Sequence, residues 1–430
     1  MKVFTKLVAT GLFMTLFISM YPSSEVNAAE KTVTYISVEA FSEHIAKEIT
    51  VAAVNGSYAE GLKGMGIIKD GEYSSYDTNL TRGDAMVILN RADEYLYGDQ
   101  VDRSLVQLAI DKRISDISKV DESKRADVAK AYLKGFMKGY SNGAYCTDRE
   151  LKVTIKISEE GALSCIAMLK DKSKRAKISP DGQLIRTTKL PKSYKNYPYI
   201  LASFPNAYYD WKFYYEIVTW TEYNEKTGKM EKVPLKNLVD YAKPADLDLT
   251  KDIENFPSVK KERMESWVNK AKTHMECIFN IDYRTSGKEW IDLITSASMS
   301  SGIKDSEENR REMLTKFLVR AKDNKTVIES SLIATDGSSM YYFDGSYYLR
   351  FYVKYRIVSS KTLYKSGEAY LENDLFYTNY PILLNDFELG EWRECFFDVE
   401  LDNPYGTEPE NLGVYQAKIF EEFYTGTIIK

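Results

Sequence analysis

The chain is predicted to be multidomain: α-helical repeats come first, and an α+β domain with a curved antiparallel sheet follows. Two observations predict this order. In the first half, two segments have apolar residues at helical spacing. In both segments a glycine turn comes first and a helix N-cap residue follows. In the second half, helical patterns give way to runs that alternate apolar and polar residues between Asp-Gly turns. With 430 residues, the chain is long enough for two or three domains.

Residues 1–28 are predicted to be a secretory signal peptide. Two lysines precede an apolar run over residues 7–20, and small residues lead up to Ala28, after which cleavage is expected. A membrane anchor is the alternative, but the run is short for a span of about 20 residues. No later segment is apolar enough to cross a bilayer, so we expect no membrane attachment after cleavage.

Charge and composition limit the partners. The formal net charge of −5 becomes −6 after cleavage, because two positive charges and one negative charge are lost. Nucleic-acid binding needs clustered Lys and Arg and is not expected. Two His and four Cys without metal-ligand spacing predict no metal or cofactor. Two states of the four cysteines are compatible with the sequence: a disulfide between Cys146 and Cys165, or four buried free thiols. We prefer the free thiols.

The segment that begins at Thr81 is predicted to be a helix. Apolar residues from Ala85 to Leu96 recur at helical spacing, Thr81 is a good N-cap, and Asp84 can reach back to it as in a capping box. Residues 82–84 spell Arg-Gly-Asp, which in another setting would be a receptor-binding tripeptide. Such a tripeptide is usually displayed on a mobile loop, whereas here it forms the first turn of a helix.

A second copy of this organisation follows. Gly66 precedes two isoleucines, and Gly135, which is 69 positions later, precedes Phe136 and Met137. Each glycine is expected to close a short helix. Ser158 then stands at the N-cap position that Thr81 occupies in the first copy. The two copies therefore predict an internal repeat.

These residues resemble the S-layer homology (SLH) module, in which a "GIIxGY"-like turn is followed by a helix that opens with "ITRAE". The matching segments are Gly66-Ile67-Ile68, Leu80 to Ala85, Ile114 to Ile117 and Gly139 to Gly143. The resemblance covers residues 38–170, within a repeat domain assigned to residues 29–178. It implies a secreted cell-surface protein of a Gram-positive bacterium of the clostridial or bacillar type. Such modules bind a secondary cell-wall polysaccharide, often a pyruvylated one, without covalent attachment and in a pseudo-threefold arrangement of repeats.

The resemblance implies polysaccharide contacts at Thr81, Arg82 and Asp84 in the first repeat and at Gly139 in the second. An Arg fork pairs well with a carboxylate, and we expect free amides in the first turn of the helix to assist it. In the second repeat Ser158-Glu159-Glu160 replaces the Thr-Arg pair, so only one complete anion site is expected. The alternative is that Arg82 is a surface residue of a structural helix. Only two repeats are recognisable, and the helix at residues 38–49 is expected to complete the first.

Residues 179–242 are predicted to be an extension that resembles the continuation seen in secreted SLH proteins. Its end contributes to a β-hairpin between residues 213 and 247 that turns at Thr227-Gly228. Residues 243–258 are acidic, contain Pro244 and Pro257, and are predicted to be a linker.

Residues 259–430 form the predicted α+β domain. Three amphipathic helices come first, with apolar stripes that include Trp267, Trp290 and Phe317. Strands follow, and residues 346–358 alternate cleanly, which predicts an antiparallel strand with one buried face. By shape this domain is similar to the cystatin-like or nuclear-transport-factor-like (NTF2-like) class, an analogy that carries no function.

Two classes of function remain open. Asp282, Arg284 and Glu289 lie close in sequence and could support acid–base chemistry, although capping and ion pairing are commoner at such a turn. Tyr352 could stack on a sugar from the polar face of its strand, or it could belong to a Tyr-rich core. Without a catalytic constellation, we expect a non-enzymatic surface protein whose C-terminal domain meets a partner protein. The alternative is a wall-associated hydrolase with its site in that domain.

Overall fold

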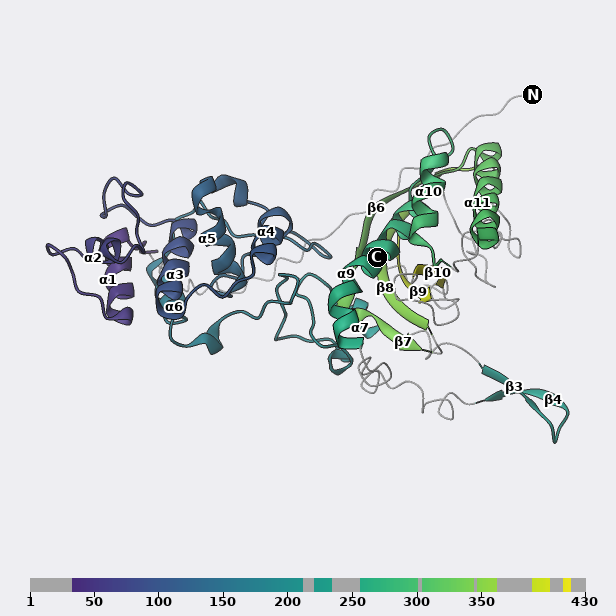
Figure 1. The fold of residues 1–430 in the computed structure, drawn as a ribbon, viewed down its shortest axis with the longest axis horizontal. Helices are drawn as coiled ribbons and strands as arrows, with labels where there is room; N and C mark the ends of the chain where they lie inside the picture. Colours follow the sequence, from purple (N-terminus) through teal and green to yellow (C-terminus); the bar gives the residue numbers. More distant parts are fainter. Residues whose placement is uncertain are drawn as a thin grey trace, which may run out of the picture.

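The computed structural model describes residues 33–211, 220–233, 256–300, 304–343, 346–361, 389–402 and 413–418. The predicted signal peptide and most of the predicted linker lie outside these residues. Figure 1 shows a helical part and a sheet part side by side along the longest axis. We call residues 33–178 the helical part, residues 179–211 the junction segment and residues 256–418 the sheet part.

The helical part consists of short helices and one small pair of strands. Its elements are α1 Val38–Ile49, α2 Tyr58–Gly64, α3 Arg82–Tyr97, α4 Arg103–Lys112, η1 Ile117–Lys119, α5 Glu122–Leu133, β1 Tyr140–Ser141, β2 Arg149–Glu150, α6 Glu159–Ile166 and η2 Lys172–Lys174. The predicted helix starts at Thr81 and Ser158 are confirmed, because each of these residues is an N-cap.

The two repeat glycines occupy equivalent turns. Gly66 and Gly135 have φ of +74° and +79°, a conformation that favours glycine. The amide of Ile67 donates to the carbonyl of Leu62 at 3.0 Å, and the amide of Phe136 donates to that of Ala131 at 3.1 Å. Both bonds span five residues, as in a Schellman motif. The two turns that the sequence analysis paired therefore have the same backbone geometry.

Three helix starts meet in a closed ring of backbone hydrogen bonds. Leu80 donates to the Ile36 carbonyl at 2.9 Å, Ile36 donates to that of Ile157 at 3.4 Å, and Ile157 donates to that of Leu80 at 3.0 Å. We call these three residues the cap ring. The residue after each one is an N-cap whose hydroxyl accepts a bond from the third helical amide. Helix α1, which was expected to complete the first repeat, is therefore the third member of a pseudo-threefold group with α3 and α6.

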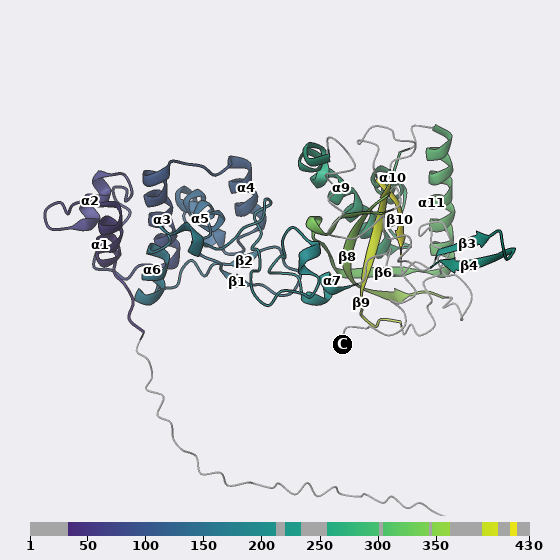
Figure 2. The ribbon, with the colours of Figure 1, turned by 90° about the horizontal axis from the view of Figure 1, so that it is seen from below.

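Figure 2 shows α1, α3 and α6 next to one another at the end of the helical part. They enclose one hydrophobic core, to which each helix supplies fully buried side chains such as Phe41, Leu89 and Ala162.

The junction segment and the following hairpin contain η3 Tyr194–Asn196, α7 Asn206–Asp210, β3 Trp220–Asn224 and β4 Lys229–Val233. The predicted hairpin is confirmed over its described residues, since β3 and β4 pair antiparallel and Gly228 turns with φ of +66°. The remainder of that predicted hairpin lies outside the described residues.

The sheet part is a mixed α+β unit. Its elements are α9 Phe256–Phe279, β5 Ile281–Asp282, α10 Lys288–Ala297, α11 Lys304–Asn324, β6 Val327–Thr335, η5 Gly337–Ser339, β7 Tyr341–Phe343, β8 Ser346–Ser359, β9 Arg393–Asp402 and β10 Gly413–Lys418. The strand order is β10-β9-β8-β6-β5, with β7 also paired to β8, and all pairs are antiparallel. The expected α+β class with a curved antiparallel sheet is confirmed (Figure 1). Helix α9 begins at Phe256, inside the stretch predicted as linker.

Strand β8 is buried on both faces over part of its length, which corrects the expectation of one buried face. Leu349, Phe351 and Val353 pack with the α9 side chains, as their alternation predicts. Arg350 and Tyr352 point the other way and are 1% and 3% exposed, because the junction segment covers them. Figure 2 shows α9 and α7 on opposite sides of β8. Tyr352 therefore belongs to a Tyr-rich core and is not available to stack on a sugar.

Candidate functional site

Arg82 is the first residue of α3 and lies beside an exposed tyrosine. Its side chain is half-buried, and its Nε donates to the Leu151 carbonyl at 2.9 Å. The centre of its guanidinium lies 5.5 Å from the centroid of the Tyr140 ring, and the Lys152 Nζ lies 4.1 Å from the same centroid. Cations this close to a ring are attracted to its π-system. We call Arg82, Tyr140 and Lys152 the Arg82 site.

Gly139 holds Tyr140 in place beside the two cations. Its φ is +63°, and a Cβ at this position would lie 2.8 Å from Leu151 Cδ2 and 3.0 Å from the backbone carbonyl oxygen of Glu150. The neighbouring residue Tyr140 pairs with Glu150 in the β1–β2 ladder. Gly139 is thus required for the close approach of two backbone segments, and its role at the site is to position the tyrosine.

The amides of the first turn of α3 are already bonded, which corrects the expectation that they are free. The Arg82 amide donates to the Ile155 carbonyl at 2.9 Å, and the Gly83 amide donates to the Val153 carbonyl at 2.8 Å. The Asp84 amide donates to Thr81 Oγ1 at 3.1 Å. The loop before α6 lies against the helix start and supplies these carbonyls. Recognition of an anion at this site therefore depends on side chains.

Thr81 and Asp84 stabilise the helix start. The Thr81 hydroxyl donates to Asp84 Oδ2 at 2.8 Å, and the Lys124 Nζ lies 2.8 Å from Asp84 Oδ1. The Asp84 carboxylate is thereby neutralised, so it does not repel an anion bound near Arg82. Gly83 is buried between them, and Arg-Gly-Asp forms one turn of a capped helix as the sequence predicts.

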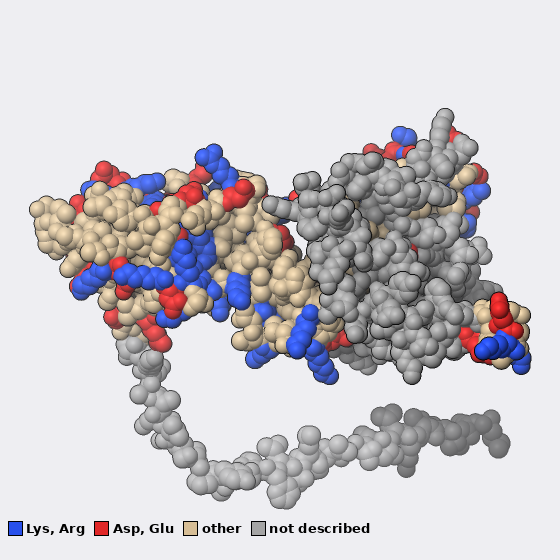
Figure 3. All heavy atoms as spheres, turned by 60° about the horizontal axis from the view of Figure 1, so that its bottom comes forward, with Lys and Arg blue, Asp and Glu red and all other residues tan. Residues whose placement is uncertain are grey.

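Two residues of the site were missed by the sequence analysis. Tyr140 lies within the segment Gly139 to Gly143, which resembles the SLH turn. An aromatic residue in that segment could have indicated a sugar-binding position. Lys152 had no such signal, because its position depends on a left-handed backbone with φ of +55° that turns its chain toward Tyr140. Figure 3 shows Lys and Arg side chains gathered near the middle of the helical part on the face turned to the viewer.

The pseudo-threefold group distinguishes Arg82 from its counterparts. The first helical residues are Val38 in α1, Arg82 in α3 and Glu159 in α6. The amide of each residue donates a hydrogen bond to a carbonyl in the segment that precedes one of the other two helices. The backbone at the three helix starts is therefore alike. Among these three positions only α3 carries a cation, which agrees with the expectation of one anion site.

The acidic residues considered for catalysis form an ordinary ion pair. Arg284 Nε lies 2.8 Å from Asp282 Oδ1, and Arg284 Nη2 lies 2.5 Å from Oδ2. The hydrogen bonds from Arg284 lower the pKa of Asp282. Glu289 lies in the exposed first turn of α10. A carboxylate held ionised in this way is a poor proton donor.

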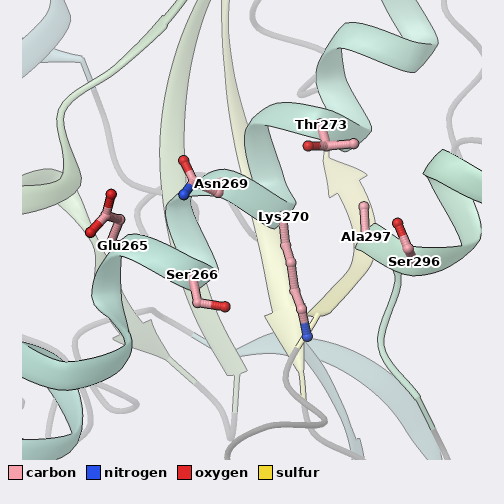
Figure 4. A pocket seen from close by; sticks show the side chains of 7 residues that line it. All are labelled: Glu265, Ser266, Asn269, Lys270, Thr273, Ser296 and Ala297. Atoms are coloured by element: carbon pink, nitrogen blue, oxygen red, sulfur yellow. The ribbon is translucent and has the colours of Figure 1, made fainter. Parts of the chain in front are cut away.

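A surface pocket of about 470 Å³ lies between α9 and the end of α10. Figure 4 shows the side chains that line it: Glu265, Ser266, Asn269, Lys270, Thr273, Ser296 and Ala297. Burial lowers the pKa of Lys270. None of these lining residues forms a nucleophile–base pair in the hydrogen bonds of the described chain.

The cysteines are free thiols, and the Cys146–Cys165 disulfide is not formed. Cys165 and Cys277 are buried, whereas Cys146 and Cys395 are intermediate in exposure, so the preferred expectation of four buried thiols holds for two. Over the ranges that the structure describes, no three His, Cys, Asp or Glu side chains gather in a way that would hold a metal ion. In the same ranges, no helix has the length and apolar character to cross a bilayer.

Comparison with known family models, curated proteins and solved structures found no match to the chain.

Gly139→Ala is expected to lower the free energy of unfolding by about 2 kcal/mol, because a left-handed alanine costs about 1–2 kcal/mol and its Cβ meets Leu151 and Glu150. Gly56→Ala is the matched control: Gly56 has φ of +80°, and nothing lies within 4 Å of its added Cβ. The control is expected to lose only the backbone contribution. Equal losses in urea unfolding followed by circular dichroism would show that the close approach at Gly139 is unimportant.

Proposed function

We propose that the chain is a non-enzymatic, secreted cell-surface protein of a Gram-positive bacterium. Its helical part anchors it non-covalently to a cell-wall secondary polysaccharide in the manner of SLH modules. The sheet part, for which we propose the cystatin-like or NTF2-like class, is an interaction domain that meets a surface protein partner.

The Arg82 site carries this proposal. The hydrogen bond from Arg82 to the protein uses Nε. Its terminal nitrogens have no protein partner among the described residues, and they can form charge-assisted bonds to a carboxylate. Lys152 adds a second positive charge, and Tyr140 is 45% exposed. An aromatic face beside two cations suits a sugar ring that bears an acidic substituent.

The cap ring supports the likeness to SLH modules. The resemblance implies a pseudo-threefold arrangement of repeats, each with a helix that opens with an "ITRAE"-like segment. Here Ser37, Thr81 and Ser158 cap three helices linked through one ring of backbone bonds. The likeness rests on this arrangement together with the sequence matches at Gly66 and Leu80 to Ala85.

The hydrolase alternative gains no support from the described residues. Asp282 is paired with Arg284, and the α9–α10 pocket is lined by hydroxyls, an amide, one carboxylate and one amine from neighbouring helical turns. We therefore propose no reaction for the sheet part.

Binding to isolated cell walls tests the proposed function. The mature chain is expected to sediment with walls that keep their secondary polysaccharide and to be released by a chaotrope but not by mild detergent. Walls stripped of that polymer by acid extraction are the control and are expected to bind little. Equal binding to stripped walls, or recovery of the uncleaved chain in the cytosol of the producing cell, would contradict the proposal.

A further inference from the structure

The helical part and the sheet part are joined through buried aromatic residues. The Tyr145 ring stacks on the Tyr352 ring with centroids 3.6 Å apart and planes 6° apart. The Tyr145 amide donates to the carbonyl of Ser203 in the junction segment at 2.6 Å. One hydrophobic cluster contains side chains from the helical part, the junction segment and strand β8. The two parts are therefore connected by packing as well as by the chain itself.

Helix α7 attaches the junction segment to the sheet through two hydroxyls. Tyr208 donates to the Arg350 carbonyl at 2.7 Å and accepts the Asp336 amide at 3.1 Å. Tyr209 accepts the Leu201 amide at 3.0 Å and donates to Asp336 Oδ2 at 2.7 Å. Asp336, at the end of β6, is thus bonded to both tyrosines.

Asp336 is buried, and no Lys or Arg of the described residues forms an ion pair with it. It is 1% exposed, and its carboxylate accepts bonds from Tyr209 and, at 2.9 Å, from the Ser338 amide. The Arg350 guanidinium on the neighbouring strand is bonded to Asp398. In the junction segment, the carboxylate of Asp181 repels that of Asp336, and Asp181 is itself paired with Arg113 of the helical part at 3.1 Å.

The remaining titratable group that faces Asp336 is Tyr199, whose hydroxyl is neutral near pH 7, and burial raises its pKa further. Nothing in this set compensates a negative charge on Asp336 fully. Burial raises the pKa of Asp336 to about 6, although the hydrogen bonds from Tyr209 and Ser338 lower it in part.

We propose that the docking of the junction segment, and of the helical part attached to it, on the sheet part is pH-sensitive and is tighter in acid, where Asp336 is protonated, than at neutral pH. The Asp336 carboxyl group is buried where α7 packs on the end of β6, and loss of its proton leaves a buried charge there. The described contacts thereby couple proton binding at one residue to the docking of the two parts.

The direction and size of the effect follow from proton linkage. The folded pKa of about 6 lies above the ordinary value of 3.8, so the docked state binds the proton more tightly than the open one does. Docking is favoured below the ordinary pKa and is weakened as the pH rises through 6. Between pH 5 and pH 7 the equilibrium constant for opening is expected to rise about tenfold.

Hydrogen exchange measured by mass spectrometry on the full mature chain tests the proposal. After correction for intrinsic exchange rates, the peptides that contain Tyr145 and Leu201 are expected to exchange about tenfold faster by local opening at pH 7 than at pH 5. Peptides of α1 serve as an internal reference, because this helix is remote from the junction segment in sequence and packs in another core.

Two variants separate the proposal from a general effect of pH. Asp336→Asn is expected to abolish the difference between pH 5 and pH 7 while the α1 peptides stay protected. Tyr209→Phe removes one donor to the carboxylate and is expected to move the midpoint of the transition to higher pH. An unchanged pH dependence in either variant, or exchange of the wild-type Tyr145 and Leu201 peptides that is independent of pH, would overturn the proposal.

Discussion

Asp398→Ala is expected to destabilise the sheet part by about 3–5 kcal/mol, because it leaves a buried guanidinium without its partner. Asp398 and Arg350 are 0% and 1% exposed in their side chains, and two bonds of 2.8 and 2.9 Å join them. Tyr341 donates a further bond of 2.7 Å to Asp398. Urea unfolding followed by far-ultraviolet circular dichroism measures the loss.

Glu329→Ala is the matched control for this prediction. Glu329 pairs with Arg356 between β6 and β8 of the same sheet, but the two side chains are 41% and 34% exposed. An exposed pair contributes about 0–1 kcal/mol, so the control is expected to unfold almost as the parent does. If Asp398→Ala lost no more stability than Glu329→Ala, the buried Arg350–Asp398 pair would stabilise the sheet part no more than an exposed pair does.

Local signals predicted the starts and ends of the helices well. Thr81 and Ser158 precede apolar residues at helical spacing, and the cap depends only on residues within one turn. Gly66 and Gly135 were found for the same reason, since a left-handed residue after a helix is encoded locally. These features required no knowledge of the tertiary structure.

Long-range pairing explains what the sequence did not predict. The carbonyls of Val153 and Ile155 bond to the start of α3, and no local pattern reveals that a loop so distant in sequence covers these amides. Helix α1 was assigned to the first repeat because its partners in the cap ring are not its neighbours in sequence. The signal was present in Ile36 and Ser37, which repeat the apolar residue and hydroxyl cap of Leu80 and Thr81.

The sheet shows the same limit. The alternation of β8 correctly identified Leu349 and Phe351 as core residues. It also predicted that the opposite face is polar and exposed, because Arg350 is a charged residue. Alternation along one strand cannot show that the junction segment covers that face. Strands β5 and β10 were not predicted: β5 has two residues, and β10 pairs only at the edge of the sheet.

Arg82→Ala is expected to weaken binding to the wall polysaccharide by roughly ten- to a hundredfold. A charge-assisted bond contributes about 1.5–3 kcal/mol, and the bonded first-turn amides cannot replace the lost side chain. Arg82 also donates to the Leu151 carbonyl, so the variant must keep its helical circular-dichroism signal for the result to concern binding. Glu159→Ala at the equivalent position of α6 is the matched control, and removal of its negative charge is expected to leave binding unchanged or slightly improved.

The proposed anchoring at Arg82 is tested by the dissociation constants of the mature chain, Arg82→Ala and Glu159→Ala for purified wall polysaccharide. Isothermal titration at low and at physiological ionic strength is suitable, because a contact between charges weakens as salt is added. We expect one site per chain, a ten- to hundredfold weaker constant for Arg82→Ala and a constant at least as tight as the parent's for Glu159→Ala. If Arg82→Ala binds the polysaccharide as tightly as the parent does, the helical part is a structural platform and the proposed anchoring at Arg82 is wrong.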